Sequence, residues 1–173
     1  MTRRFDREHN DKVHMQSLCA LAHYDFNAAG EFSYEQAFNV ILRLNLGHDA
    51  LQEMYRRMVF NVLARNQDDH TRNIAFLMDK KGAWRLAPAF DVIWAFNPAG
   101  IWTNRHQMSI NGKRDGLTWR DLEAPAKQHD IRAAAKIREE VAAAVAEWLQ
   151  CAHLAGVDAK TAKAIKATHH FSL

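Results

Sequence analysis

The stretch that decides the fold reads Asn66-Gln67-Asp68-Asp69-His70-Thr71-Arg72-Asn73. Before it, residues 51–63 carry apolar side chains at the i, i+3, i+4 and i+7 spacing of a helix with one buried face. After it the period changes, because residues 74–78 and 83–86 are short apolar runs and the turn between them ends at Gly82. We therefore predict a polar loop that leaves a long helix and continues into a small β-hairpin.

The polar side chains of this loop suit one kind of chemistry. Phosphoryl transfer uses a carboxylate to orient or deprotonate the attacking hydroxyl, and an amide and a second carboxylate to hold magnesium against the nucleotide phosphates. Asp68 and Asn73 have the D-x-x-x-x-N separation that protein kinases use for the first two groups, and Asp91 follows the predicted hairpin. The spacing therefore favours a magnesium and phosphoryl-transfer centre.

The spacing alone leaves two alternatives open. In the first, Asp68, Asp69 and His70 are solvated residues at a helix end, Asn73 is a turn residue and Asp91 caps the next segment. The D-x-x-x-x-N pattern is loose enough to recur by chance in many chains. In the second, a metal-dependent hydrolase binds a divalent metal through Asp68, Asp69, His70 and Asp91.

The rest of the chain predicts a mainly α fold. It has 173 residues with only three prolines and seven glycines, which favours helices and suits a single domain over residues 1–173. Capping-box patterns begin at Ser33 and Thr118. Further helices are expected over residues 13–23, 34–44, 131–154 and 159–168, with a long loop over residues 97–116.

The predicted core follows from the apolar stripes. On the helix over residues 34–44, the side chains expected to face inward are Tyr34, Phe38, Ile41 and Leu42. The aromatic residues near the hairpin are interpreted as core packing, and they are Trp84, Phe90, Trp94 and Phe96. The remaining scattered histidines, including His106, are interpreted as surface or packing residues.

Composition narrows the class of protein. The formal net charge is +3, without a basic tract interleaved with aromatics, so direct nucleic-acid binding is not expected. Cys19 and Cys151 lie in predicted helices without CxxC spacing, which indicates reduced core thiols. No apolar run is long enough to span a bilayer, and the first residues lack the apolar segment of a signal peptide. We expect a cytoplasmic protein without membrane contact.

Four segments make the chain resemble a known family. They are Arg4-Phe5-Asp6-Arg7, the stretch starting at His14-Met15-Gln16-Ser17-Leu18-Cys19, the loop over residues 66–73, and Leu86-Ala87-Pro88-Ala89-Phe90-Asp91, followed by Asn111-Gly112-Lys113. Together they resemble the carboxy-terminal catalytic domain of HipA-type serine/threonine kinases, the toxins of type II toxin–antitoxin systems. The resemblance implies a kinase C-lobe-like helical domain with a small β-hairpin after the catalytic loop.

The resemblance also implies roles for the loop residues and a pair of cofactors, ATP and Mg²⁺. Asp68 corresponds to the family's catalytic aspartate and Asn73 to its magnesium-binding asparagine. Asp91 corresponds to the aspartate that replaces the kinase DFG aspartate. His70 and Arg72 fall between them, where His70 would orient the loop or touch phosphate and Arg72 would contact phosphate or substrate.

A further implied site is the adenine pocket. The segment that contains Arg4, Phe5 and Asp6 falls where the family's chain crosses between lobes and lines that pocket. We expect these residues to contact ATP through backbone more than through charge.

The sequence also departs from the family. Full-length members have an amino-terminal lobe with a phosphate-covering loop and a phosphate-binding lysine, and we expect that lobe to be absent here. Phosphoryl transfer needs a closed site with positioned charges, so a single lobe should show weak kinase activity or none. The alternative is a non-catalytic binding module for a HipB-like antitoxin or a separate N-terminal lobe, with dimerisation through the same face.

Overall fold

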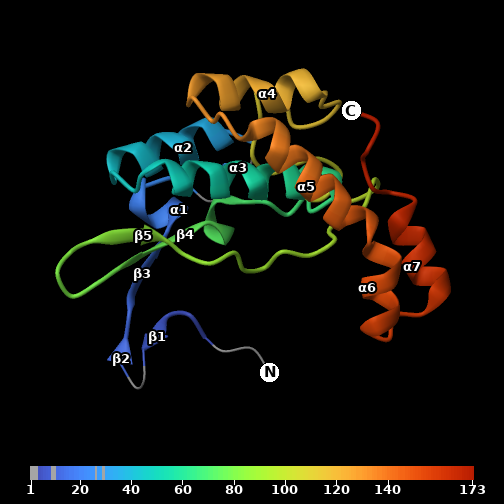
Figure 1. Cartoon of the computed structure of the whole chain (residues 1–173), viewed down its shortest axis with the longest axis horizontal. Coiled ribbons are helices and arrows are strands. Elements are labelled where there is room, and N and C mark those ends of the chain that lie inside the picture. Colours follow the sequence, from blue (N-terminus) through green and yellow to red (C-terminus); the bar gives the residue numbers. More distant parts are fainter. Residues whose placement is uncertain (1–3, 9–10, 26, 29) are drawn as a thin grey trace.

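Helices and one small sheet make up the fold of this computed structural model (Figure 1). The structure describes residues 4–8, 11–25, 27–28 and 30–173. Seven α-helices hold 41% of the chain, counted over these described residues, which confirms the mainly α prediction. Within the same ranges, the apolar content and length of every helix fall short of what crossing a membrane requires.

The core forms where α2 (Tyr34–Arg43) packs against α3 (His48–Leu63). The predicted capping box starts α2: Ser33 Oγ accepts from Gln36 N at 3.2 Å, and the Gln36 side chain accepts from Ser33 N at 2.7 Å. The apolar stripe of α3 is buried as predicted, and it consists of Leu51, Met54, Tyr55, Met58, Val59, Val62 and Leu63. Burying one such side chain contributes roughly 1.5–3 kcal/mol, so α3 is a firm base for the loop that follows it.

The predicted hairpin is present as β4 (Ala75–Met78) and β5 (Trp84–Leu86), but it belongs to a three-stranded sheet. The third strand is β3 (His14–Ser17), which pairs antiparallel with β4. The helix predicted over residues 13–23 is therefore wrong for its first part, and only α1 (Leu18–Leu21) is helical. A short isolated helix is marginal in water, whereas a strand on the edge of β4 gains a full ladder of hydrogen bonds.

A second pair of strands, β1 (Arg7–Glu8) and β2 (Asp11–Lys12), forms a separate antiparallel ladder near the amino terminus.

The carboxy-terminal part contains one more helix break than predicted. The second capping box starts α4 (Trp119–Gln128) as expected. The helix predicted over residues 131–154 is two helices, α5 (Ala134–Ala146) and α6 (Trp148–Leu154), interrupted at Glu147. The interruption lets Trp148 Nε1 donate to the Ala162 carbonyl in α7 (Ala159–Lys166) at 2.9 Å. Figure 1 shows α5 beside α3, and α6 and α7 as a pair at one end of the molecule.

Three core predictions need correction. Leu42 is 53% exposed because it lies at the edge of the buried face formed by Tyr34, Phe38 and Ile41. Trp94 is 40% exposed, whereas Trp84 packs against the core. Cys19 is buried as expected, but Cys151 is exposed on α6; both are free thiols.

Candidate functional site

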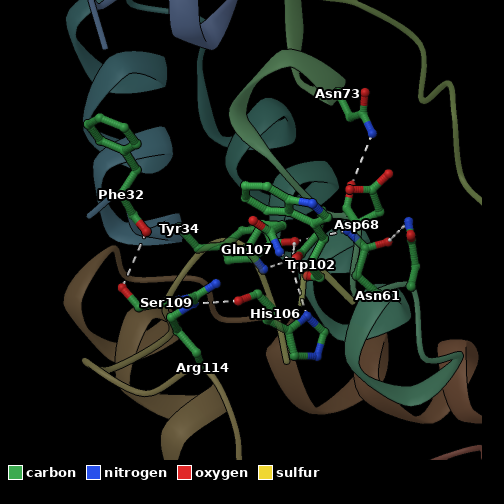
Figure 2. A network of polar contacts seen from close by, with 12 residues as sticks. Phe32, Tyr34, Asn61, Asp68, Asn73, Trp102, His106, Gln107, Ser109 and Arg114 are labelled. Atoms are coloured by element: carbon green, nitrogen blue, oxygen red, sulfur yellow. Dashed lines mark hydrogen bonds and ion pairs between the residues drawn. The ribbon is translucent and has the colours of Figure 1, made fainter. Parts of the chain in front are cut away.

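The predicted catalytic loop leaves α3 and closes on itself. It ends in the 3₁₀ turn η1 (Thr71–Asn73), where Asn73 Nδ2 donates to the Asp68 backbone carbonyl at 3.1 Å (Figure 2). This bond joins the two ends of the D-x-x-x-x-N spacing and turns the Asn73 amide oxygen away from Asp68. The Asp68 side chain is 39% exposed, and its Oδ1 lies 3.9 Å from His70 Nε2. The loop therefore presents an accessible carboxylate beside an imidazole.

The neighbouring carboxylate, Asp69, points into the protein, where only 1% of its side chain is exposed. It accepts hydrogen bonds from the Tyr34 hydroxyl at 2.9 Å and from Gln107 N at 2.8 Å. His106 Nδ1 lies 2.9 Å from the same carboxylate. A buried charge is tolerated when it is paired and hydrogen-bonded, so Asp69 anchors the loop to α2 and to the 106–107 segment.

The electrostatics of Asp69 and Tyr34 agree with these roles. Burial alone would raise the pKa of Asp69, but His106 and the hydrogen bonds from Gln107 N and Tyr34 outweigh it and lower this pKa. Burial raises the pKa of Tyr34 well above its usual value, and the charge of Asp69 adds to the effect. Asp69 therefore stays ionised and Tyr34 stays a donor.

The network continues on both sides of Asp69. Asn61 Nδ2 on α3 donates to the Tyr34 hydroxyl oxygen at 2.9 Å, and Asn66 Nδ2 donates to Asn61 Oδ1 at 3.0 Å. Arg114 Nε donates to the His106 carbonyl at 2.5 Å (Figure 2). The loop is thus fixed by side chains from α2, α3 and the 106–114 segment.

Asp91 has a different kind of support. Its φ is 53°, a left-handed conformation that residues other than glycine seldom adopt, and the residue is exposed. Further along, Ala95 N donates to the Arg65 carbonyl and Gln67 N donates to the Ala95 carbonyl, each at 3.0 Å. These bonds form a parallel bridge between Asn66 and Ala95. Backbone contacts therefore hold the chain after Asp91 against the start of the catalytic loop.

The predicted site residues line two neighbouring cavities. The first has a volume of about 320 Å³ and is lined by Asn73 and Asp91. The second has a volume of about 240 Å³ and is lined by Asp68. His70 lines both cavities. The structure therefore brings Asn73 and Asp91 together and places Asp68 next to them, on the other side of His70.

Arg57 adds a cation to the first cavity that the sequence did not single out. Its Nε donates to Glu53 and its Nη2 to the Ala87 carbonyl, both at 2.8 Å. Its Nη1 is buried and has no hydrogen-bond partner among the residues that the structure describes. A buried guanidinium donor left over in the same cavity as Asn73 and Asp91 fits an anionic ligand.

The residue types at this cavity also fit magnesium. Mg²⁺ takes oxygen ligands, and Asn73 with Asp91 offers one amide and one carboxylate. Within the described ranges, groups of three His, Cys, Asp or Glu side chains that could hold a metal ion are absent. Asp69, which the hydrolase alternative requires as a ligand, already accepts two hydrogen bonds and faces His106 inside the protein. The pair Asn73 and Asp91 is therefore the better candidate for a metal held jointly with phosphate.

Among the described residues of the amino-terminal segment, Phe5 meets the lining of the first cavity through an aromatic contact. Arg4 donates to the Asp6 carboxylate at 2.8 and 2.6 Å. The hydrogen bond from Arg4 lowers the pKa of Asp6 to about 2. The Phe5 ring lies 5.7 Å from the ring of Phe90, which lines the cavity. Arg72 is exposed on η1 and is absent from the described residues that line either cavity.

Comparisons with known proteins place the chain in a family. The sequence model of the family described as "HipA-like C-terminal domain" matches residues 1–149. The chain belongs to the HipA-like C-terminal domain family, as the sequence resemblance predicted.

Individual proteins match this chain either over a short stretch or at low sequence identity. A Haemophilus influenzae protein named "Putative kinase" is 39% identical over 62 residues, which are 35% of this chain and 18% of that protein. The structure of a Shewanella oneidensis MR-1 toxin–antitoxin complex of HipA, HipB and operator DNA matches with a TM-score of 0.68 at 18% identity. That match covers 95% of this chain and 46% of the other, so the chain spans about half the length of its structural neighbour. At this identity the likeness establishes the fold.

Sequence reasoning missed most of the buried network. Tyr34 was expected only as a core residue and His106 only as a packing histidine, because 37 residues separate His106 from Asp69 and give no local spacing. The paired carboxylates Asp68 and Asp69 were the available signal. In the structure the two adjacent carboxylates point in different directions, and Asp69 is the one that turns inward.

Proposed function

We propose that the chain, as a single domain over residues 1–173, is the kinase C-lobe-like part of an ATP-dependent serine/threonine kinase. The observation that carries this proposal is the division of Asp68 from Asn73 and Asp91 between two cavities that meet at His70. A kinase must hold the attacking hydroxyl and the phosphoryl group of the nucleotide side by side, and the two adjoining cavities offer a place for each.

Asp68 is proposed as the catalytic carboxylate on the acceptor side. Its exposed Oδ atoms would orient a protein hydroxyl and take the proton from that oxygen as it attacks. The walls of its cavity include the apolar side chains Phe32, Trp102 and Met108. A substrate seated against these walls would displace water and so strengthen the contact between its hydroxyl and the carboxylate. His70 would keep the loop in this orientation or touch phosphate from the cavity edge.

Asn73 and Asp91 are proposed to hold Mg²⁺ on the nucleotide side. Bound Mg-ATP would supply the transferable phosphoryl group, with the metal neutralising charge on the phosphates. Arg57 would donate to phosphate oxygens from the cavity wall, and Arg72 would approach phosphate or substrate from η1. Phe5 and its segment, which includes Arg4 and Asp6, would border the adenine through backbone and ring contacts.

A partner is part of the proposal. The chain spans about half of the HipA of the Shewanella complex, in which HipA is assembled with HipB and DNA. We infer that this chain works with an amino-terminal lobe that covers the nucleotide, and that a HipB-like antitoxin is a candidate regulator. Ile101, 80% exposed, and Trp102, 58% exposed, are apolar side chains suited to a protein contact beside the second cavity. If Asp68 and Asp91 proved to have no catalytic role, the surface around Ile101 and Trp102 would be the contact surface of a non-catalytic binding module.

The experiment is magnesium-dependent transfer of radiolabelled phosphate from ATP to a serine- and threonine-containing protein mixture. It compares the chain alone with a chimeric protein, here called the composite, in which this chain replaces the corresponding half of the Shewanella HipA. We expect little transfer by the chain alone, and transfer by the composite that Asp68→Asn abolishes and the surface change Asp49→Asn retains. Equal transfer by the composite and its Asp68→Asn variant, with both folded in a thermal melt, would overturn the catalytic role.

A further inference from the structure

Residues beyond 149 lie outside the part of the chain that the family model matches, yet they reach the candidate site. After α7 the chain turns back toward the helical core (Figure 1), where His170 N donates to the Leu63 carbonyl at the end of α3 at 2.9 Å. We call Thr168–His170 the C-terminal latch. Its contacts fall just before the loop that carries Asn73 and on the segment that carries Asp91.

Thr168 makes the central contacts of the latch. Its carbonyl accepts from Arg65 Nε at 2.9 Å, and its Oγ1 accepts from Trp94 Nε1 at 2.9 Å. The same hydroxyl donates to the Ile165 carbonyl at 2.6 Å, which fixes its orientation at the end of α7. One residue therefore binds two segments that are far apart in the sequence.

Those two segments flank the backbone bridge of the site. Arg65 directly precedes Asn66, and Trp94 directly precedes Ala95, the two partners of the parallel bridge. The bridge joins the start of the catalytic loop to the chain that leaves Asp91. Because Asp91 is exposed and in a left-handed conformation, its own surroundings do little to fix it. The bridge and the groups that stabilise it therefore set where Asp91 lies relative to the loop.

Arg65 strengthens this interpretation. Its φ is 58°, also left-handed, and its guanidinium lies over the Phe96 ring at 4.7 Å from the centroid. The side chain thus touches the chain after Asp91 while donating to Thr168. Arg65 is half-buried in these contacts, and this burial lowers the pKa of its guanidinium. A solvated surface arginine would gain little from this arrangement.

We propose that Thr168 is a positioning residue for the proposed kinase site, acting through Arg65 and Trp94 on the bridge that places Asp91 beside Asn73. The effect of Thr168 on metal binding rests on the proposed function. The effect of Thr168 on the backbone bridge can be measured without nucleotide or metal. The end of α7 and the residues that follow it thus have a role in the geometry of the site.

The first experiment is amide hydrogen exchange at Ala95 and Gln67, the two donors of the bridge. Thr168→Val keeps the shape of the side chain and removes the hydroxyl, and we expect about fivefold faster exchange at both amides. Thr168→Ser should restore the wild-type rates. Thr161→Val, at an exposed position on α7 just before Thr168, makes the same chemical change away from Trp94 and should change neither rate.

Unchanged exchange at Ala95 and Gln67 in Thr168→Val would overturn the proposal. So would an equal acceleration throughout α2 and α3, since that would report a loss of global stability. Trp94→Phe, which removes the other partner of the same hydrogen bond, should reproduce the effect of Thr168→Val and guards against a variant that fails to fold.

A second measurement separates the latch from the function on which it rests. Mn²⁺ serves as a probe for the magnesium site, and we expect its dissociation constant to rise several-fold in Thr168→Val and to recover in Thr168→Ser. If Thr168→Val binds Mn²⁺ as tightly as the wild type, the proposal that the latch positions Asp91 is overturned. If the wild type binds no Mn²⁺, the proposed metal site fails, whereas the exchange rates still decide the latch.

Discussion

The loop over residues 66–73 and the segment over residues 91–96 carry the two halves of the proposed site, and they are held in opposite ways. The loop is fixed by buried side chains that meet at Asp69. The segment is exposed at Asp91 and is held by backbone bonds at Ala95 and by Thr168 from the carboxy terminus.

The difference indicates which half can move. A buried, fully hydrogen-bonded network is costly to open because each group left without its partner carries a desolvation penalty. A segment that is held by a few hydrogen bonds and has few buried side chains opens at lower free energy. We therefore expect Asp68 and Asn73 to keep their places in every state of the protein, and Asp91 to respond to nucleotide or a partner lobe.

The largest expected effect comes from removing the centre of the buried network. Asp69→Ala leaves His106 and the Tyr34 hydroxyl buried without their acceptor and should cost about 3–5 kcal/mol of unfolding free energy. Urea denaturation measures the loss. Asp68→Ala, one residue away and only partly buried, is the matched control and should change stability by about 0.5 kcal/mol or less. Similar costs for the two variants would contradict the division of roles between the adjacent carboxylates.

A smaller loss of unfolding free energy is expected when a residue at the edge of the buried network is changed. Tyr34→Phe removes the hydroxyl between Asn61 and Asp69 and should cost about 1–3 kcal/mol, because both partners stay buried. Tyr24→Phe is the control, since the Tyr24 ring is only partly buried and stacks on Phe32 at 4.2 Å. Differential scanning calorimetry should give a lower Tm for Tyr34→Phe alone. Equal Tm values would show that the hydroxyl carries no net stability.

Acid should weaken the anchoring of the loop by protonating Asp69. The pKa of Asp69 in the folded protein is lowered from the ordinary value of 3.8, so its stabilising effect is complete above that pH and is lost as the pH falls through the lowered pKa. Unfolding free energies measured from neutral pH to about pH 2 should fall less steeply for Asp69→Asn than for the wild type. Parallel curves would contradict the assignment of Asp69 as an ionised anchor.

The smallest effect on stability is expected at Asp91. Glycine adopts positive φ without strain, so Asp91→Gly should change the unfolding free energy by no more than about 0.5–1 kcal/mol. The same substitution removes a proposed magnesium ligand. Thermal melts without ligand check the first expectation, and a loss of several kcal/mol would show that the Asp91 side chain supports the fold.

The sequence predicted the parts of this molecule that depend on local patterns. The stripe of α3, both capping boxes and the turn ending at Gly82 were sufficient to place α2, α3, α4 and the hairpin. The spacing from Asp68 to Asn73 pointed to the loop.

What escaped prediction depends on contacts between distant residues. The strand His14–Ser17 becomes a strand because β4 offers an edge, and its own sequence also suits a short helix. His106 meets Asp69, and Thr168 meets Trp94, across separations that no spacing rule covers. The break at Glu147 is likewise accompanied by a long-range contact, the hydrogen bond from Trp148 to α7.

The most direct test of the central claim is a titration of the ¹⁵N-labelled chain with Mg-ATP, followed by amide chemical shifts in wild type and in Asp91→Gly. NMR detects the weak binding expected of a single lobe. The account predicts saturable shifts around Asn73, Asp91 and Arg57 in the wild type, and their loss or a marked weakening in Asp91→Gly. Identical titrations of the two proteins, or wild-type shifts that avoid the first cavity, would contradict a magnesium–nucleotide site built on Asn73 and Asp91.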